Sequence, residues 1–118
     1  MKIAVCAGEK SGDALGYELL YDLNKNNKNI EIIGVGGSLM ESQGLKSFFP
    51  IKEISYMGLV DPLMNLNKIL KIRKNFINYL KKENPDIFIG IDSPSFNSGI
   101  CKALRKDTDI KTVQYAVS

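Results

Sequence analysis

Short apolar runs, rich in β-branched residues, alternate with longer amphipathic stretches along this chain. The runs have the length and composition of strands buried on both faces of a sheet, and they cover residues 2–7, 30–35, 45–49, 87–91 and 110–117. The amphipathic stretches repeat apolar residues at helical spacing, and they cover residues 14–26, 38–43, 62–82 and 96–106. Strands that alternate with helices are typical of parallel sheets. The pattern therefore predicts an α/β fold with a doubly wound parallel sheet.

Two features of this expected fold bear on a site. Right-handed crossovers place the carboxyl ends of the strands at residues 2–7 and 87–91 side by side, at the point where the strand order reverses. Ser11 is expected to cap the helix over residues 14–26, and Asp13 suits the positive end of its dipole.

Composition narrows the class of protein. The 118 residues suffice for one domain, 44% of them are hydrophobic, and the net charge of +3 is too small to indicate nucleic acid. No apolar run is as long as a membrane span, and the first residues lack the anatomy of a signal peptide, which favours a cytoplasmic protein. Cys6 and Cys101 show no metal-ligand spacing, so they are expected to be reduced core residues, and no metal site is predicted.

Asp92 is the main candidate for chemistry. It directly follows the apolar run at residues 87–91, and ligands of open α/β sheets bind outside the carboxyl ends of the strands. The chain contains no histidine, so a general base has to be another group, and a carboxylate is the best candidate. The alternative is that Asp92 only bonds the backbone of its own loop.

The segment from Gly8 to Asp13 is a glycine-bearing connection between a strand and a helix. Such a connection presents backbone N–H groups and a helix N-terminus to an anion, although a plain turn would also use glycine. Its glycines match neither the phosphate-loop pattern nor the dinucleotide fingerprint. Gly34 and Gly36 begin that fingerprint, but Leu39 stands where the third glycine belongs.

Other function classes remain open on these residues. A nucleotide-binding oxidoreductase of the nicotinamide or flavin type and a non-catalytic binding module are two of them. A phosphoacceptor aspartate of the response-regulator kind also follows a strand. That site needs an additional acidic pair after the first strand, where only Glu9 and Asp13 are near.

Several blocks of the sequence, taken together and in order, resemble the amino-terminal part of lipid-A-disaccharide synthase. The blocks are Ala7-Gly8-Glu9-Lys10-Ser11-Gly12-Asp13, Gly34-Val35-Gly36-Gly37 with Met40 and Gly44, Met57-Gly58-Leu59-Val60, Gly90-Ile91-Asp92-Ser93-Pro94-Ser95-Phe96-Asn97, and Ile110-Lys111-Thr112-Val113-Gln114-Tyr115. They run through nearly the whole chain. Two positions depart from the family's pattern: Ser95 stands in place of a second carboxylate and Gln114 in place of a histidine.

The resemblance implies a GT-B glycosyltransferase built from two Rossmann-like domains. The family joins UDP-2,3-diacylglucosamine to 2,3-diacylglucosamine 1-phosphate and forms the β-1,6-linked lipid A disaccharide and UDP, without a metal or cofactor. Residues 1–118 would be an incomplete acceptor-side domain, and the donor-binding carboxyl-terminal half would be absent. Such a fragment is expected to be inactive alone.

The candidate site residues follow from this picture. Asp92 is expected to be the catalytic base, and the substrate-binding candidates lie in the two loops that meet beside it. These candidates are Gly8, Glu9, Ser11, Gly12, Asp13, Ser93 and Asn97.

A last stretch suggests where lipid would meet the protein. Leu59, Val60, Leu63 and Met64 are apolar beyond what one buried helix face needs if Leu66 and Leu70 face the sheet, and a cluster of lysine and arginine follows. Apolar residues beside a basic cluster suit a surface that faces anionic lipid. The prediction is a cytoplasmic protein peripheral to the inner membrane; the alternative is ordinary core beneath a loop with a solvated basic helix face.

Overall fold

The computed structural model describes residues 1–50 and 66–115. Its elements follow in the order β1 (Lys2–Ala7), α1 (Lys10–Asn26), β2 (Glu31–Val35), α2 (Ser38–Glu41), β3 (Lys46–Ser47), α4 (Leu66–Glu83), β4 (Ile87–Ile91), α5 (Pro94–Asp107) and β5 (Lys111–Tyr115). These strands form a five-stranded sheet in the order β3-β2-β1-β4-β5, and each adjacent pair is parallel. The predicted parallel sheet is confirmed.

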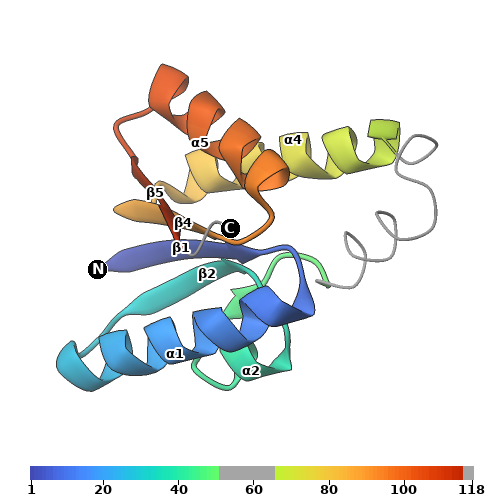
Figure 1. Cartoon of the computed structure of the whole chain (residues 1–118). Coiled ribbons are helices and arrows are strands. Elements are labelled where there is room, and N and C mark those ends of the chain that lie inside the picture. The colour runs from blue at the N-terminus through green and yellow to red at the C-terminus, as the bar shows by residue number, and fades with distance from the viewer. Residues whose placement is uncertain (51–65, 116–118) are drawn as a thin grey trace.

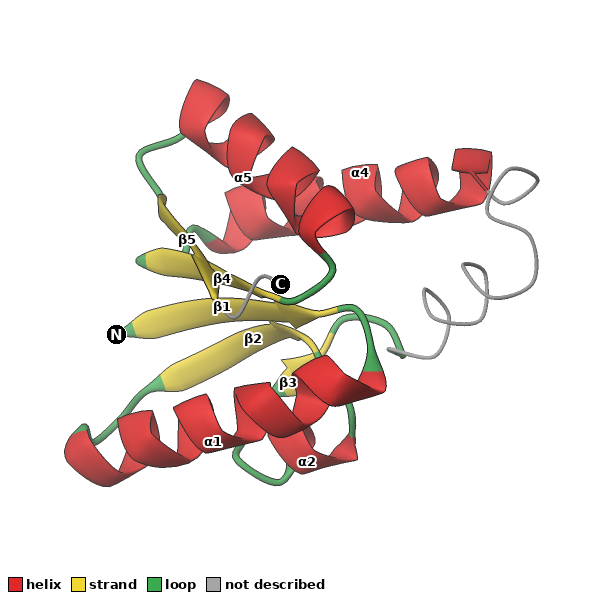
Figure 2. Cartoon of the chain, in the orientation of Figure 1, coloured by secondary structure: helices red, strands yellow, loops and turns green. Residues whose placement is uncertain are grey.

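Helices cover both faces of the sheet. Helices α1 and α2 lie on one face and α4 and α5 on the other (Figure 1), and Figure 2 shows the strands as the middle layer. The chain builds β2 and β3 on one side of β1 and then β4 and β5 on its other side. The strand order therefore reverses between β1 and β4, as predicted, and the carboxyl ends of these two strands are neighbours.

The alternation of side chains along β1 supplies both halves of the core. Ala4 and Cys6 belong to the apolar cluster on the face of α4 and α5, whereas Ile3 and Val5 belong to the cluster on the face of α1 and α2. All four side chains are buried. Successive residues of a strand point to opposite faces of the sheet, so a central strand covered on both faces has to be continuously apolar. This requirement explains why the sequence pattern identified β1 and β4 so clearly.

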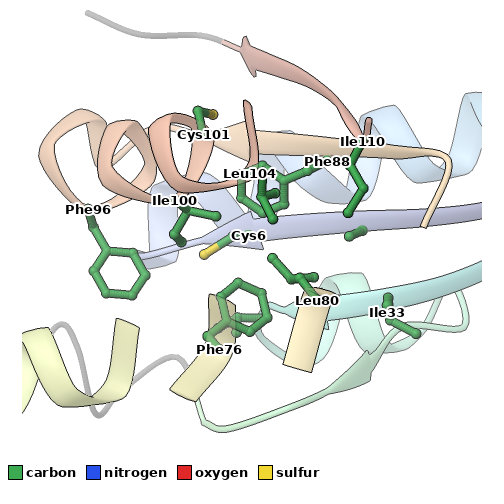
Figure 3. Packing of buried hydrophobic residues seen from close by; sticks show 12 residues of the cluster. Cys6, Ile33, Phe76, Leu80, Phe88, Phe96, Ile100, Cys101, Leu104 and Ile110 are labelled. Carbon is green, nitrogen blue, oxygen red and sulfur yellow. The ribbon is translucent and has the colours of Figure 1, made fainter. Parts of the chain in front are cut away.

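Both cysteines are free and buried, as predicted. Figure 3 shows Cys6 in the core among Phe76 and Leu80 of α4 and Ile100 of α5. Burial, with a smaller contribution from the neighbouring Cys101, raises the pKa of the Cys6 thiol far above its ordinary value. Burial also raises the pKa of Cys101. Because the thiolate is the reactive form, these two residues are suited to packing and not to nucleophilic chemistry.

Helix α1 begins earlier than the sequence pattern predicted. Its first residue is Lys10 and its N-cap is Glu9, without a side-chain cap hydrogen bond, so the prediction that Ser11 caps the helix is wrong. Glycine made this stretch resemble a turn, but Gly12 lies inside the helix. A Cβ atom on Gly12 would lie 3.2 Å from the Cβ of Ala7. The glycine thus lets the first turn of α1 pack close to the end of β1.

The buried stripe of α4 also differs from the prediction. Phe76 and Leu80 are fully buried, whereas Leu66 and Leu70 are 49% and 40% exposed, so the expectation that these two leucines face the sheet is wrong. The 18 residues of α4 span about 27 Å, while the five residues of β4 span about 17 Å. The amino-terminal turns of α4 extend past the carboxyl ends of the described strands (Figure 1).

Candidate functional site

The carboxyl ends of β1 and β4 form the edge of the sheet where the predicted site residues gather. In the parallel register, Ala7 at the end of β1 lies opposite Ile91 at the end of β4. The connection after β1 starts with Gly8, and the connection after β4 starts with Asp92. An edge of this kind, at a reversal of strand order, is where open α/β sheets bind ligands.

The carboxylate of Asp92 makes a contact across this edge. Ser11 Oγ, on the first turn of α1, donates a hydrogen bond of 3.3 Å to Asp92 Oδ2. Ser11 is exposed and Asp92 is partly exposed, so the pair is accessible to a ligand. A carboxylate at such a position can accept a proton from a bound hydroxyl group. The early start of α1 creates this contact, since it places Ser11 on the helix and not in the loop before it.

Gly8 and Ser93 bring the two connections into contact. A Cβ atom on Gly8 would overlap the Ser93 hydroxyl and lie 2.8 Å from Ser93 Cβ. Only a residue without a side chain permits this approach. The sequence predicted both residues to lie at the site, and the structure adds that the missing side chain of Gly8 leaves room for the side chain of Ser93.

The backbone at Asp92 and Ser93 is strained. Their φ angles are 54° and 42°, in the left-handed region that non-glycine residues rarely occupy. The backbone N–H of Asp92 donates to the carbonyl oxygen of Tyr115 on β5 over 3.2 Å. Strained residues of this kind persist where the surrounding structure holds them, and they cluster at functional sites. Sequence reasoning missed Tyr115 because its backbone carbonyl carries no residue-specific signal.

Asn97 lies beneath this strained turn and is fully buried. Its side-chain nitrogen Nδ2 donates to the carbonyl oxygen of Asp92 over 2.7 Å, and to those of Cys6 and Ile91 over 3.3 and 3.4 Å. Its backbone N–H donates to the carbonyl oxygen of Ser93 over 3.1 Å. The sequence predicted Asn97 as a substrate-binding residue, but the structure turns its amide toward the backbone of β1 and β4.

Asp13 is also buried, and it binds the start of α2. Its Oδ1 accepts hydrogen bonds from the backbone N–H groups of Gly37 and Met40, and its Oδ2 accepts one from Leu39, at 2.9 to 3.1 Å. A carboxylate that accepts backbone N–H groups at a helix start is strongly stabilising. Asp13 therefore ties α1 to the glycine-rich connection after β2. The sequence suggested an acidic residue at the start of α1 and did not indicate the partner on α2.

The remaining predicted residues divide into two groups. Glu9 is exposed at the start of α1, and Gly12 packs beside Ala7 at the same edge. The four residues predicted to face lipid, Leu59, Val60, Leu63 and Met64, lie outside the described residues.

A metal site and a membrane-spanning helix are two further features that bear on function. Among residues 1–50 and 66–115, no three His, Cys, Asp or Glu side chains are grouped so that they could hold a metal ion. Within the same ranges, no helix combines the length and apolar character needed to cross a bilayer.

Comparison with known proteins agrees with this architecture. The family model described as lipid-A-disaccharide synthetase matches residues 3–118. Similar proteins named lipid-A-disaccharide synthase come from Pseudomonas fluorescens (50% identical over 115 residues, 98% of this chain), Idiomarina loihiensis (46% over 114 residues, 97%) and Francisella philomiragia (47% over 115 residues, 98%). The chain spans about 30% of the length of each of these relatives. It belongs to the lipid-A-disaccharide synthetase family and corresponds to the amino-terminal portion of its members.

Proposed function

We propose that this chain supplies the acceptor-binding part of a lipid-A-disaccharide synthase. The complete enzyme would transfer 2,3-diacylglucosamine from UDP to 2,3-diacylglucosamine 1-phosphate and form the β-1,6-linked disaccharide and UDP. The observation that carries this proposal is the accessible Asp92 carboxylate, which accepts a hydrogen bond from the Ser11 hydroxyl at the carboxyl ends of β1 and β4. The donor-binding part would belong to the remaining length of the full enzyme.

In this proposal Asp92 is the general base. The attacking hydroxyl oxygen of the acceptor forms a bond to the anomeric carbon of the donor sugar, and its proton passes to the Asp92 carboxylate. The bond between that carbon and the phosphate oxygen of UDP breaks, and UDP leaves with the electron pair. The hydrogen bond from Ser11 orients the carboxylate while leaving its other oxygen for the acceptor.

The surroundings of Asp92 suit an acceptor that carries a phosphate. The first turn of α1 presents backbone N–H groups without intrahelical partners at this edge, and a helix N-terminus favours an anion. Glu9, Ser11 and Ser93 add polar groups for sugar hydroxyls, while Gly8 and Gly12 keep the backbone close. Asp13 and Asn97 would act indirectly, because their buried groups bond to the backbone.

A transferase assay tests this function. In a chimera, residues 3–118 replace the matching stretch of the Pseudomonas fluorescens protein. The chimera is expected to release UDP and form disaccharide from the two diacylated substrates, whereas the isolated 118-residue chain is expected to form none, because catalysis by positioning needs both substrates held together. The Pseudomonas fluorescens protein is the positive control. A folded chimera without transferase activity, or disaccharide formation by the isolated chain, would contradict the proposal.

The amino-terminal turns of α4 support a lipid-facing surface beside this site. Leu66 and Leu70 are largely exposed there, and Lys68, Lys71 and Lys74 are exposed on the same helix. Exposed leucines among lysines suit the interface of an anionic bilayer. We propose that this segment, together with Leu59, Val60, Leu63 and Met64, attaches the enzyme to the cytoplasmic side of the inner membrane.

Serine substitutions test this attachment. Replacing Leu59, Val60, Leu63 and Met64 with serine is expected to lower binding to vesicles that contain anionic lipid at least tenfold. The double variant L66S/L70S is expected to lower it about threefold, since each exposed leucine that inserts into the bilayer contributes to membrane affinity. Sedimentation with vesicles at low and high salt measures both effects.

The control for this experiment is L39S. Leu39 is 46% exposed on α2, across the sheet from α4, so its replacement is expected to leave binding unchanged. Circular dichroism checks that each variant is folded. Vesicle binding that survives in the fourfold variant, or unfolding of that variant, would favour the alternative that these residues are core.

A further inference from the structure

The hydrogen-bonding capacity of Asn97 is used in one direction only. Its Nδ2 atom donates to three backbone carbonyl oxygens, which belong to Cys6 on β1, Ile91 on β4 and Asp92 after it. Its Oδ1 atom is buried and has no hydrogen-bond partner within residues 1–50 and 66–115. A buried oxygen without a partner is costly. The hydrogen bonds that Nδ2 donates therefore have to offset the cost of this unpartnered oxygen.

These three carbonyl groups lie at the site. Cys6 and Ile91 lie at the carboxyl ends of β1 and β4, where the candidate site is, and Asp92 is the proposed base. The amide thus joins both strand ends to the peptide that follows Asp92.

The turn at Asp92 depends on such support. Its φ of 54° is a left-handed conformation, which costs an ordinary residue about 1–2 kcal/mol. The N–H of Asp92 bonds to β5 and its C=O bonds to Asn97, so both backbone groups are held. The direction of the Asp92 side chain follows from this backbone conformation, and it brings Oδ2 to Ser11.

A glycine on β4 makes room for this arrangement. A Cβ atom on Gly90 would lie 2.7 Å from the Cβ of Asn97 and 3.1 Å from its Nδ2, closer than side chains pack. Asn97, in the first turns of α5, therefore brings its Nδ2 atom to the strand ends only because residue 90 lacks a side chain.

We infer that Asn97 is a positioning residue, which holds the strained turn at Asp92 so that the carboxylate points at the acceptor hydroxyl. This inference rests on the proposed function for its catalytic consequence. Its structural part, that the amide of Asn97 keeps the Asp92 turn closed, concerns this chain alone.

The substitution N97D tests both parts, because it keeps the shape of the side chain and replaces its donors with an acceptor. In the 118-residue chain, amide hydrogen exchange followed by NMR is expected to lose at least tenfold protection at Asp92, relative to the amides in the middle of β1. The control is L104A, because Leu104 is fully buried on the same helix, about two helical turns beyond Asn97. It is expected to affect Asp92 no more than the rest of the sheet.

The catalytic part is measured in the chimera. N97D is expected to reduce kcat about 100-fold while KM for each substrate stays within about threefold, because misplacing a reacting group by about 1 Å has an effect of this size. L104A is expected to keep kcat within about threefold even where it lowers stability more. A merely structural role for Asn97 predicts that kcat follows stability in both variants.

A second variant covers the case in which N97D does not fold. G90A keeps the Asn97 side chain but pushes its amide away from the strand ends, so it is expected to show the same loss of Asp92 protection and a smaller fall in kcat. Unchanged exchange at Asp92 in the folded variant overturns the inference. An inactive chimera overturns the proposed function, while the exchange data still decide whether Asn97 holds the turn.

Discussion

Replacing Asp92 with asparagine is expected to reduce turnover of the chimera about 10³-fold. General-base catalysis contributes roughly 10²- to 10⁴-fold to enzymatic rates, and asparagine keeps the size of the side chain but cannot accept the proton. KM is expected to change little, because the amide can still bond to the acceptor hydroxyl and to Ser11. Initial rates of UDP release, measured at saturating concentrations of both substrates, give kcat.

The fold is expected to survive this substitution. The structural hydrogen bonds at this position use the backbone of Asp92, whereas its carboxylate accepts a hydrogen bond from the exposed Ser11. The matched control is D86N, because Asp86 precedes the opposite end of β4 and accepts a hydrogen bond from the backbone N–H of Lys2. D86N is expected to keep kcat within about twofold. Near-normal turnover in D92N would remove Asp92 from the role of base.

Replacing Gly34 with alanine is expected to give the largest loss of stability of any glycine in the described residues. Gly34 has a φ of 135°, and a Cβ atom there would overlap the carbonyl group of Val5 on the neighbouring strand. Val5 is fully buried and pairs with Gly34 in the sheet, so neither strand can move aside without disturbing the core. We expect the free energy of unfolding to fall by more than about 4 kcal/mol, as with other severe steric changes in a core.

Gly44 provides the comparison. Its φ of 98° is also positive, but a Cβ atom there would meet nothing within 4 Å. G44A is therefore expected to lose only about 1–2 kcal/mol from the strained backbone. Urea unfolding of the two variants, followed by circular dichroism, separates backbone strain from steric overlap. Equal losses in both variants would show that the sheet relaxes around residue 34.

What the sequence determined by itself was the order of the elements and the edge at which the site lies. A central strand has to be apolar on both faces, so Lys2–Ala7 and Ile87–Ile91 are recognisable as strands without their partners. Because a parallel sheet with right-handed crossovers has few topologies, their adjacency followed as well. The placement of Asp92 and the glycine-bearing connection at one edge needed only these local patterns.

Only the tertiary structure decided which groups meet there. Asp13 bonds to backbone groups 24 to 27 residues away, and Asn97 reaches the carbonyl of Cys6 across 91 residues. The sequence does not indicate these backbone partners, since almost every residue has the same backbone N–H and C=O groups. Helix α4 is also longer than the strands beneath it, and in its first turns Ile69 packs against the core while Leu66 and Leu70 are exposed. Periodicity tells which side of a helix is apolar, but the neighbouring elements determine which of those apolar residues are covered.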